Sequence, residues 1–203
     1  MPKVSQSYLD ARRAEILDAA VACFAREGFH RATMQDIVKE SSLSAGAIYN
    51  YFNSKEEIVE AIADERHGKE QNVIREAGKE ATVEGALRRI RDFFFGGLKN
   101  PRERLRRRVS IELWAEAQRN PKILKIIRRG IDEPRALLKN ILSDAQERGE
   151  ISDRVDPDAT ARFLIAAFHG LALQIEWDSQ LPVQPQIRLL DFFLESLSTG
   201  GRR

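Results

Sequence analysis

Residues 28–57 read GFHRATMQDIVKESSLSAGAIYNYFNSKEE, a run from which two short helices and the turn between them can be predicted. Thr33 and Ser44 carry hydroxyls placed to cap these helices, which the pattern puts at Met34–Glu40 and at 45–50. The serine-rich link between them forms the turn. Because helices of one or two turns are unstable alone, both must be held by packing against longer neighbours.

The apolar residues of this run fall on one side of both helices, while small residues open the N-terminal end of the second helix on the other side. Small residues allow backbone amides to approach a phosphate or a base edge closely, and the amide end of a helix favours an anion. The arrangement predicts a helix-turn-helix. The inward residues are Met34, Ile37, Val38, Leu43, Ile48 and Phe52, and the outward residues are Ser44, Ala45, Gly46, Ala47, Tyr49 and Asn50.

Helices continue on both sides of this motif. Upstream, a helix over Asp10–Glu27 ends at Gly28, where a left-handed C-cap is expected. Downstream, Ser54 and Glu57 form a capping box that opens a long helix over 54–77. Apolar residues recur every three or four positions without a sustained period-two run, which predicts an all-α fold. Further helices are expected at 82–98, 101–118, 121–148, 157–178 and 184–198, with a kink at Pro134 and a frayed tail over 200–203.

Composition sets limits on location and chemistry. No window approaches the roughly 18 uninterrupted apolar residues of a membrane span, and no apolar leader follows Met1, so the cytoplasm is expected. A single cysteine, Cys23, cannot form an intramolecular disulfide. Charged residues make up 32% of the chain yet sum to only +2, so net charge alone does not indicate nucleic acid. The three histidines are far apart, and no nucleophile motif, metal-ligand spacing or glycine-rich phosphate loop appears, which argues against an enzyme, a metal site or a cofactor.

The motif resembles the TetR/AcrR family of transcriptional regulators. The resemblance rests on residues 28–37, 43–52 and 54–56, whose many fixed spacings extend it over roughly residues 9–60. One departure concerns the turn. Where the family often has Ala-Gly, this chain has Ser41-Ser42, so Ser42 is expected to adopt positive φ at a cost on the order of 1 kcal/mol.

The resemblance implies which residues touch DNA. Asn50 suits an adenine edge and Tyr49 a thymine methyl, although Tyr49 has the alternative of a partly buried packing residue. Residues 9–69 carry eight positive and eleven negative side chains, a net of −3, which favours discrete contacts by a dimer over a broad cationic surface. The implied phosphate and backbone contacts are Thr33, Tyr51 and Lys55, and the implied major-groove residues are Ser44, Ala45, Gly46, Tyr49 and Asn50.

The segment 157–178 carries two apolar stripes, so that helix needs two partners. An ordinary core helix is one interpretation. The resemblance implies instead a homodimer joined by a four-helix interface, made by this helix and helix 184–198 of each subunit. One stripe is Ala159, Phe163, Ala166, Gly170, Leu173 and Trp177, and the other is Ile165, Phe168, Ala172 and Ile175.

Aromatic residues of the C-terminal region are candidates for a ligand pocket, although pocket walls and core look alike in sequence. The expected effector is a small hydrophobic molecule, with an acyl-CoA-like compound as the first candidate. Arginines at 102, 104 and 106–108 form a cationic cluster that would attract an anion, or that is simply a solvated helix face. The candidates are Phe93, Phe94, Phe95, Leu113, Trp114, Phe163, Phe168 and His169, with Gln174 or Glu176 as polar anchors.

These expectations divide the chain into 1–55, a helix-turn-helix DNA-binding domain extended by the linking helix 54–77, and 56–203, a helical ligand-binding and dimerisation domain. The expected function is a ligand-responsive repressor that binds a palindromic operator as a homodimer and is released by its effector. The alternative is a helical interaction protein that kept the fold without operator binding. The expected partners are double-stranded operator DNA, a second copy of the chain and the effector, with no membrane and no cofactor.

Overall fold

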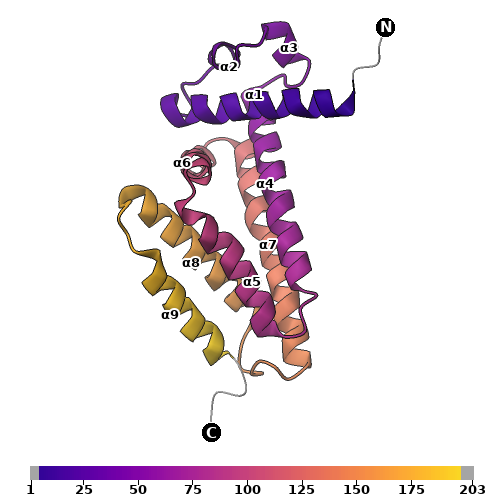
Figure 1. Cartoon of the computed structure of the whole chain (residues 1–203), viewed down its shortest axis with the longest axis vertical. Helices are drawn as coiled ribbons and strands as arrows, with labels where there is room; N and C mark the ends of the chain where they lie inside the picture. The colour runs from indigo at the N-terminus through magenta and orange to yellow at the C-terminus, as the bar shows by residue number, and fades with distance from the viewer. Residues whose placement is uncertain (1–4, 198–203) are drawn as a thin grey trace. The chain divides into compact units, whose positions relative to one another are not determined.

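The computed structural model describes residues 5–197, apart from the side chains of Lys99 and Arg102. Within that range the chain is all-α, as predicted, with nine α-helices, one 3₁₀ turn and no strand (Figure 1). The predicted tail 200–203 lies outside the described residues. Among described helices, none is both long enough and apolar enough to cross a membrane. The helices are α1 Gln6–Glu27, α2 Met34–Ser41, α3 Ala45–Tyr49, α4 Lys55–Ala77, α5 Val83–Gly96, α6 Pro101–Glu116, α7 Pro121–Glu147, α8 Pro157–Trp177 and α9 Val183–Ser196, with the 3₁₀ turn η1 at Gly97–Lys99.

Local chemistry explains where the first helix differs from its prediction. Helix α1 begins at Gln6 instead of Asp10, because the Ser5 hydroxyl accepts the Tyr8 N–H at 3.3 Å and caps an additional turn. Gly28 ends α1 with a positive φ of 81°, but its ψ of 148° is extended, so the predicted left-handed cap is wrong in that angle. The chain therefore leaves α1 in an extended direction that only glycine adopts readily.

The residues before and after α3 were expected to have particular geometries, Ser42 from the family resemblance and Ser54 from its spacing to Glu57. Ser42 has φ 57° and ψ 16°, which confirms the expected positive φ. The Ser54 hydroxyl accepts the Glu57 N–H at 3.2 Å, as the predicted capping box requires. The Glu57 carboxylate, however, accepts the N–H of Asn53 at 2.7 Å, one residue before the predicted partner.

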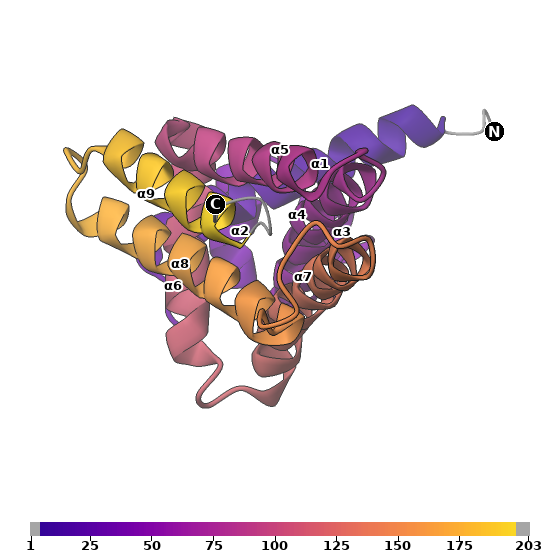
Figure 2. The same ribbon diagram turned by 90° about the horizontal axis from the view of Figure 1, so that it is seen from below.

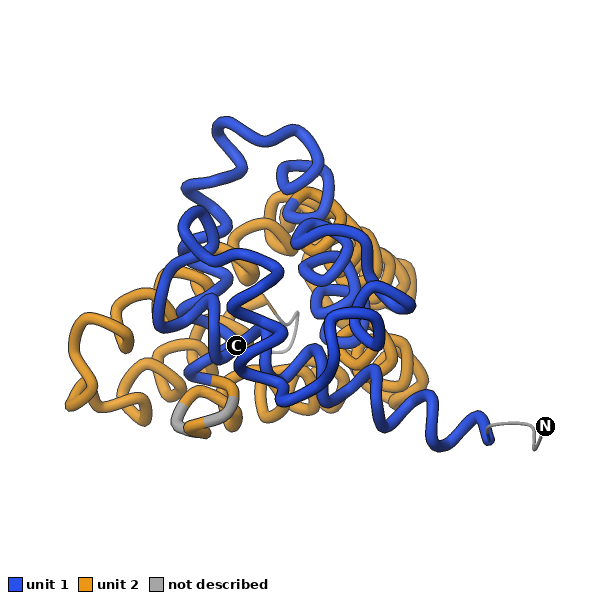
Figure 3. Tube along the Cα trace, turned by 90° about the horizontal axis from the view of Figure 1, so that it is seen from above, with its two compact units in different colours: residues 1–66, 104–127 blue, residues 67–103, 128–203 orange. Residues whose placement is uncertain are grey.

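Packing divides the chain into two compact units (Figure 3). Unit 1 is residues 1–66 with 104–127, and unit 2 is residues 67–103 with 128–203. Helices α4, α6 and α7 each contribute residues to both units. The predicted functional boundary between 1–55 and 56–203 is a separate matter and stays a prediction.

Unit 1 is built around one apolar cluster that joins α1, α2, α3 and the first part of α4. Ile16, Phe24, Ile37, Ile48 and Ile58 are completely buried in it. All six residues predicted to point inward from the helix-turn-helix belong to this cluster or pack against it. The cluster supplies the support that the two short helices need.

Unit 2 contains two apolar clusters instead of one. The larger joins α4, α5, α7 and α8 around Ile74 and Leu142, and the smaller lies around Leu171 and Ile175. Figures 1 and 2 show α8 and α9 running side by side. Ion pairs tie helices of this unit together, between Arg91 of α5 and Asp191 of α9, and between Arg135 of α7 and Asp158 of α8.

Candidate DNA-binding surface and ligand pocket

The N-terminus of α2 is fixed by a reciprocal capping box. The Thr33 hydroxyl oxygen accepts the Asp36 N–H at 3.2 Å, and the Asp36 carboxylate accepts the Thr33 N–H at 3.0 Å. The Thr33 hydroxyl also donates to that carboxylate at 2.5 Å. These hydrogen bonds, the hydroxyl one first, lower the pKa of Asp36 below its usual value. Thr33 is exposed, but both of its donors are directed at Asp36.

Helix α3 presents the face that was predicted from the sequence. Ser44 caps it by accepting the Ala47 N–H at 3.2 Å, and Ile48 is completely buried beneath it. Tyr49 is 46% exposed, so about half of its surface is available for a contact. Among the other predicted DNA contacts, Ser44, Gly46 and Asn50 are exposed, whereas Ala45 and Tyr51 are half-buried.

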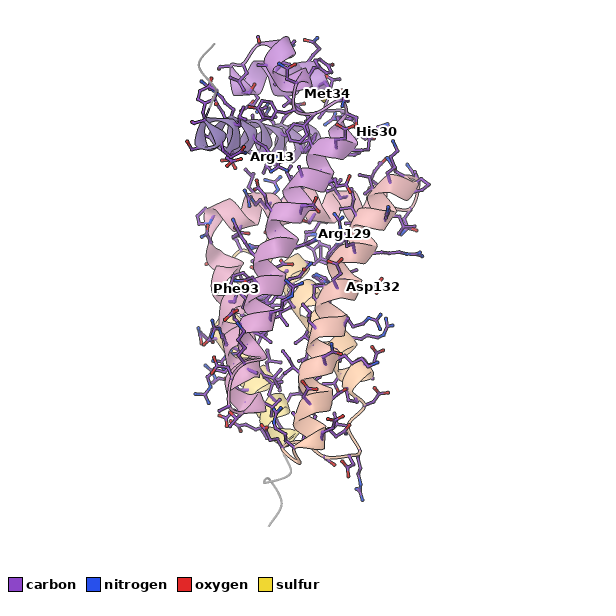
Figure 4. All side chains as sticks on the ribbon, turned by 90° about the vertical axis from the view of Figure 1, so that its right-hand side faces the viewer. Arg13, His30, Met34, Phe93, Arg129 and Asp132 are labelled. Atoms are coloured by element: carbon purple, nitrogen blue, oxygen red, sulfur yellow. The ribbon has the colours of Figure 1, made fainter. Side chains whose placement is uncertain are left out.

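Lys55 makes contacts that the sequence did not reveal. Its ammonium donates to the carbonyl oxygen of Phe29 at 2.7 Å and to that of His30 at 3.4 Å, and it lies 4.7 Å from the centre of the Phe29 ring. Figure 4 labels His30, in the segment between α1 and α2, and Met34, at the start of α2. Lys55 therefore stabilises the segment that leads into the helix-turn-helix.

A pocket of about 660 Å³, part of which is open to solvent, lies within unit 2. Residues of five helices, α4, α5, α7, α8 and α9, line it, and most are apolar. Its mostly apolar lining suits a small, largely apolar molecule. The lining residues are Glu70, Ile74, Leu87, Ile90, Arg91, Phe94, Phe95, Gly130, Pro134, Leu138, Leu164, Ile165, Phe168, His169, Leu190 and Leu194.

Aromatic rings form one wall of the pocket. The ring of Phe168 on α8 meets Phe94 and Phe95 of α5 edge to face, with centroid distances of 5.1 and 5.7 Å. With His169, these three residues are the predicted pocket candidates that the structure brings together.

Other candidates lie elsewhere. Phe93, labelled in Figure 4, is 42% exposed on α5, and Phe163 is 55% exposed on α8. Leu113 and Trp114 belong to unit 1, where Leu113 is part of the apolar cluster. The proposed polar anchors Gln174 and Glu176 do not line the pocket. Neither does the described part of the arginine cluster, in which Arg106 pairs with Asp18 at 3.5 Å.

Two polar residues of the pocket, Glu70 and Arg91, were not predicted, whereas His169 was. Glu70 is 8% exposed. Arg91 donates through Nε and Nη2 to Asp92, at 2.9 and 2.7 Å, and through Nη1 to Asp191. A Cβ at Gly130 would overlap the His67 ring, so a larger residue there would require that ring to move. No sequence motif marks these residues, since they come together only through helix packing.

Helices α8 and α9 carry uncovered apolar side chains. Phe163 and Trp177 of α8 are 55% and 76% exposed, and Leu189 and Phe192 of α9 are 68% and 69% exposed. No atom outside the local helix lies within 4 Å of where a Gly170 Cβ would stand. The exposed residues of α8 belong to the first predicted stripe, whereas Ala172 and Ile175 of the second are buried. Over the described residues, no cluster of three metal-ligating side chains was found.

The chain matches two family descriptions. Residues 16–62 match "Bacterial regulatory proteins, tetR family", and residues 83–199, more than half of the chain, match "BetI-type transcriptional repressor, C-terminal". The HTH-type transcriptional regulator UidR of Escherichia coli K12 is 28% identical over 173 residues, which are 84% of this chain and 85% of UidR. The structure of Salmonella enterica GusR is 28% identical, with a TM-score of 0.78 over 97% of this chain and 98% of GusR.

Two further solved structures share the fold at lower identity. SmeT of Stenotrophomonas maltophilia, in a complex with triclosan, has a TM-score of 0.81 at 22% identity over 94% of this chain and 93% of SmeT. FadR of Bacillus subtilis, in complex with stearoyl-CoA, has a TM-score of 0.74 at 23% identity over 93% of this chain and 99% of FadR. These likenesses concern the fold.

Proposed function

The chain belongs to the TetR family of bacterial regulatory proteins and is therefore a DNA-binding transcriptional regulator; we propose that it is a repressor that binds a palindromic operator as a homodimer. Its family consists of regulators, not enzymes. The observation that carries the proposal is the exposed outer face of α3, held on a completely buried Ile48. Because its target is operator DNA, the proposed place of action is the cytoplasm.

Helix α3 is the proposed reading element. Exposed Asn50 suits a bidentate pair with adenine and exposed Tyr49 an apolar contact with a thymine methyl, while Ser44, Ala45 and Gly46 let the helix approach closely. Tyr51 and Lys55 are proposed phosphate contacts. Thr33 is a third proposed phosphate contact, and it would require one of the Thr33 donors to leave Asp36.

The uncovered face of α8 and α9 supports the homodimer. Four large apolar side chains, Phe163, Trp177, Leu189 and Phe192, are exposed there in the single chain. Large exposed apolar side chains are typical of an interface, and a two-fold axis would pair α8 and α9 with the same helices of a second copy. The free space at Gly170 suits close helix approach.

The proposed effector is a small, largely apolar molecule that occupies the pocket of unit 2. Its walls are mostly aliphatic and aromatic, and Glu70, Arg91 and His169 are available for a few polar groups. Triclosan and stearoyl-CoA, which SmeT and FadR hold, both have a large apolar part. An acyl-CoA-like compound therefore stays the first candidate.

Helix α4 offers a route for linkage between DNA and effector. Lys55 is at its start, and Glu70 and Ile74, further along the same helix, line the pocket. A ligand that binds better when α4 is displaced must weaken DNA binding by the same factor by which DNA weakens ligand binding, typically about 1–3 kcal/mol.

The test begins with a selection of duplexes from random sequences, followed by fluorescence-anisotropy titrations at several salt concentrations. Wild-type protein should enrich a palindrome. Lys55→Ala should weaken binding and flatten the salt dependence by roughly one phosphate. Enrichment of no palindrome would favour the interaction protein without operator binding.

Effector release is tested on the same duplex with a defined panel: dodecanoyl-CoA, dodecanoate, triclosan and citrate. Release by one or more of the apolar compounds is expected. Release by citrate alone would contradict the proposed effector class.

A further inference from the structure

Phe29, the second residue after α1, is held at its ring, its N–H and its carbonyl. Its side chain is 4% exposed and meets the Phe24 ring edge to face at 5.4 Å. Its N–H donates to Glu112 Oε2 of α6 at 3.0 Å. Its carbonyl accepts from Lys55 Nζ of α4 at 2.7 Å. All of these residues belong to unit 1.

The two polar contacts are complementary in charge. The Glu112 carboxylate accepts the Phe29 N–H, and the Lys55 ammonium donates to the Phe29 carbonyl. The partly positive N–H therefore meets a negative charge, and the partly negative oxygen meets a positive charge. Hydrogen bonds to charged groups are stronger than neutral ones. They also join segments far apart in sequence, since Glu112 is 83 residues from Phe29 and Lys55 is 26.

The glycine before Phe29 makes room for this arrangement. Gly28 has φ 81°, and a Cβ there would stand 3.2 Å from Glu112 Oε2. Any side chain at Gly28 would therefore crowd the carboxylate and strain the backbone. The exit of the chain from α1 and the position of Glu112 are matched to each other.

This connection precedes α2 directly, with only four residues between Phe29 and Met34. Helices α2 and α3 have eight and five residues, so their placement depends on packing and on how the chain enters them. A small change in direction at Phe29 would displace the face of α3, and base contacts tolerate little displacement.

From this geometry we infer that Glu112 is a positioning residue for operator recognition: by accepting the Phe29 N–H it fixes the entry into α2 and thus the face that α3 offers to DNA. The inference rests on the proposed function, which supplies the DNA. Glu112 itself is assigned no contact with DNA. Lys55 supports the same residue from the other side, but it is also a proposed phosphate contact, so Glu112 is the residue to test.

The experiment compares three full-length variants. Glu112→Ala removes the acceptor, Glu112→Gln keeps an acceptor oxygen without the charge, and Glu116→Ala removes a carboxylate one turn further along α6. Hydrogen exchange of the Phe29 amide is measured without DNA, operator affinity by anisotropy on the duplex that wild-type protein enriches, and stability by thermal unfolding.

Glu112→Ala should accelerate exchange of the Phe29 amide and weaken operator binding, each by about tenfold or more, because a charge-assisted hydrogen bond is lost. Glu112→Gln should retain most of the amide protection and most of the operator affinity. Glu116→Ala should change neither the exchange rate of the Phe29 amide nor the operator affinity. The inference is overturned if Glu112→Ala behaves like Glu116→Ala in exchange or in operator affinity, or if Glu112→Gln is as defective as Glu112→Ala. If wild-type protein enriches no duplex, the proposed function fails, and the exchange measurement still decides whether Glu112 holds Phe29.

Discussion

The two units use the same aliphatic and aromatic residue types for different purposes. Unit 1 fills its interior with one cluster, in which Ile16, Phe24 and Ile48 have no exposed surface. Unit 2 divides its apolar residues between two clusters, and residues packed with each of them line a pocket of about 660 Å³. A filled core holds short helices in fixed positions, whereas a hollow one can accept a ligand and change with it.

This difference indicates that the two units have separate tasks. Unit 1 holds in place the helices proposed to read DNA, and unit 2 is the part proposed to respond to the effector. The elements proposed to read DNA are held by caps and by charged side chains on the Phe29 connection. The elements proposed to receive the effector and the second subunit are long helices with exposed or cavity-facing apolar residues. Substitutions in each unit can therefore test whether these roles are separate.

The largest effect is expected at the proposed dimer face. Gly170→Arg should place a charge and a steric wedge between α8 helices, giving monomers whose operator affinity falls roughly a hundredfold or more, although unit 1 is untouched. Light scattering and anisotropy measure the two effects. Gly68→Arg is the matched control, because Gly68 also has free space around it but lies on α4. A Gly170→Arg protein that stayed dimeric would move the interface elsewhere.

A second pair of substitutions separates the pocket from the surface of α5. Phe168→Asp should abolish effector-induced release, because it puts a charge into the apolar wall, while operator affinity without effector stays within about threefold of wild type. Phe93→Asp, at an exposed neighbour outside the lining, should keep the response. Release is measured with the effector identified from the panel. If Phe93→Asp abolished the response and Phe168→Asp did not, the pocket would be assigned to the wrong residues.

At the reading helix the expected effect is smaller and confined to sequence preference. Asn50→Ala should cost about 1–3 kcal/mol at one base pair of each half-site and relax the preference there. Asn53→Ala, at an exposed asparagine just beyond the motif, serves as control. Binding to duplexes substituted at each position measures the effect. An equal loss on every sequence would show that Asn50 contacts the backbone instead.

The smallest effects are expected at the helix caps, where the two units can be compared directly. Thr33 caps α2 of unit 1 and Thr82 caps α5 of unit 2. Either change to alanine should cost about 1 kcal/mol of stability, but only Thr33→Ala should also weaken operator binding. Equal operator affinities for Thr33→Ala and Thr82→Ala would contradict the idea that only the caps of unit 1 affect DNA binding.

The same cap has a pH dependence with a defined sign. Hydrogen bonds from Thr33 lower the pKa of Asp36 in the folded protein. Their stabilisation is therefore fully present above the ordinary aspartate pKa of about 3.9 and is lost as pH falls through the lowered value. Thermal unfolding between pH 5 and pH 2 should show a smaller acid-induced loss for Thr33→Ala than for wild type, by roughly the contribution of this cap. If wild type and Thr33→Ala lost the same thermal stability between pH 5 and pH 2, the proposed contribution of the Thr33–Asp36 cap would be contradicted.

Much of the fold could be predicted because its determinants are local. The hydroxyls of Thr33 and Ser44 bond to N–H groups three residues away. The positive φ of Ser42 was expected from the family resemblance instead. Helix periodicity likewise predicted which residues of α2 and α3 point inward. The start of α1 was missed because Ser5 precedes a stretch without strong apolar periodicity.

The pocket was predicted only in part. Phe94 and Phe168 were candidates because aromatic residues suit a ligand wall, and both line it. Sequence could not separate them from Phe93 and Phe163, since residues on different sides of one helix look alike in sequence and the packing partner decides which one is covered. Nor could sequence exclude Trp114 from the pocket candidates, because the packing of α6 decides that Trp114 belongs to unit 1 and not to the unit that contains the pocket.

The sequence by itself determined the all-α class, the helix-turn-helix and most helix ends, because these depend on residues within about one or two turns of each other. Only the tertiary structure decided that Lys55 and Glu112 meet at Phe29, that five helices line the pocket, and that Phe163 and Trp177 are left uncovered. These features join residues far apart in the chain. Their geometry follows from helix packing, which no local pattern records.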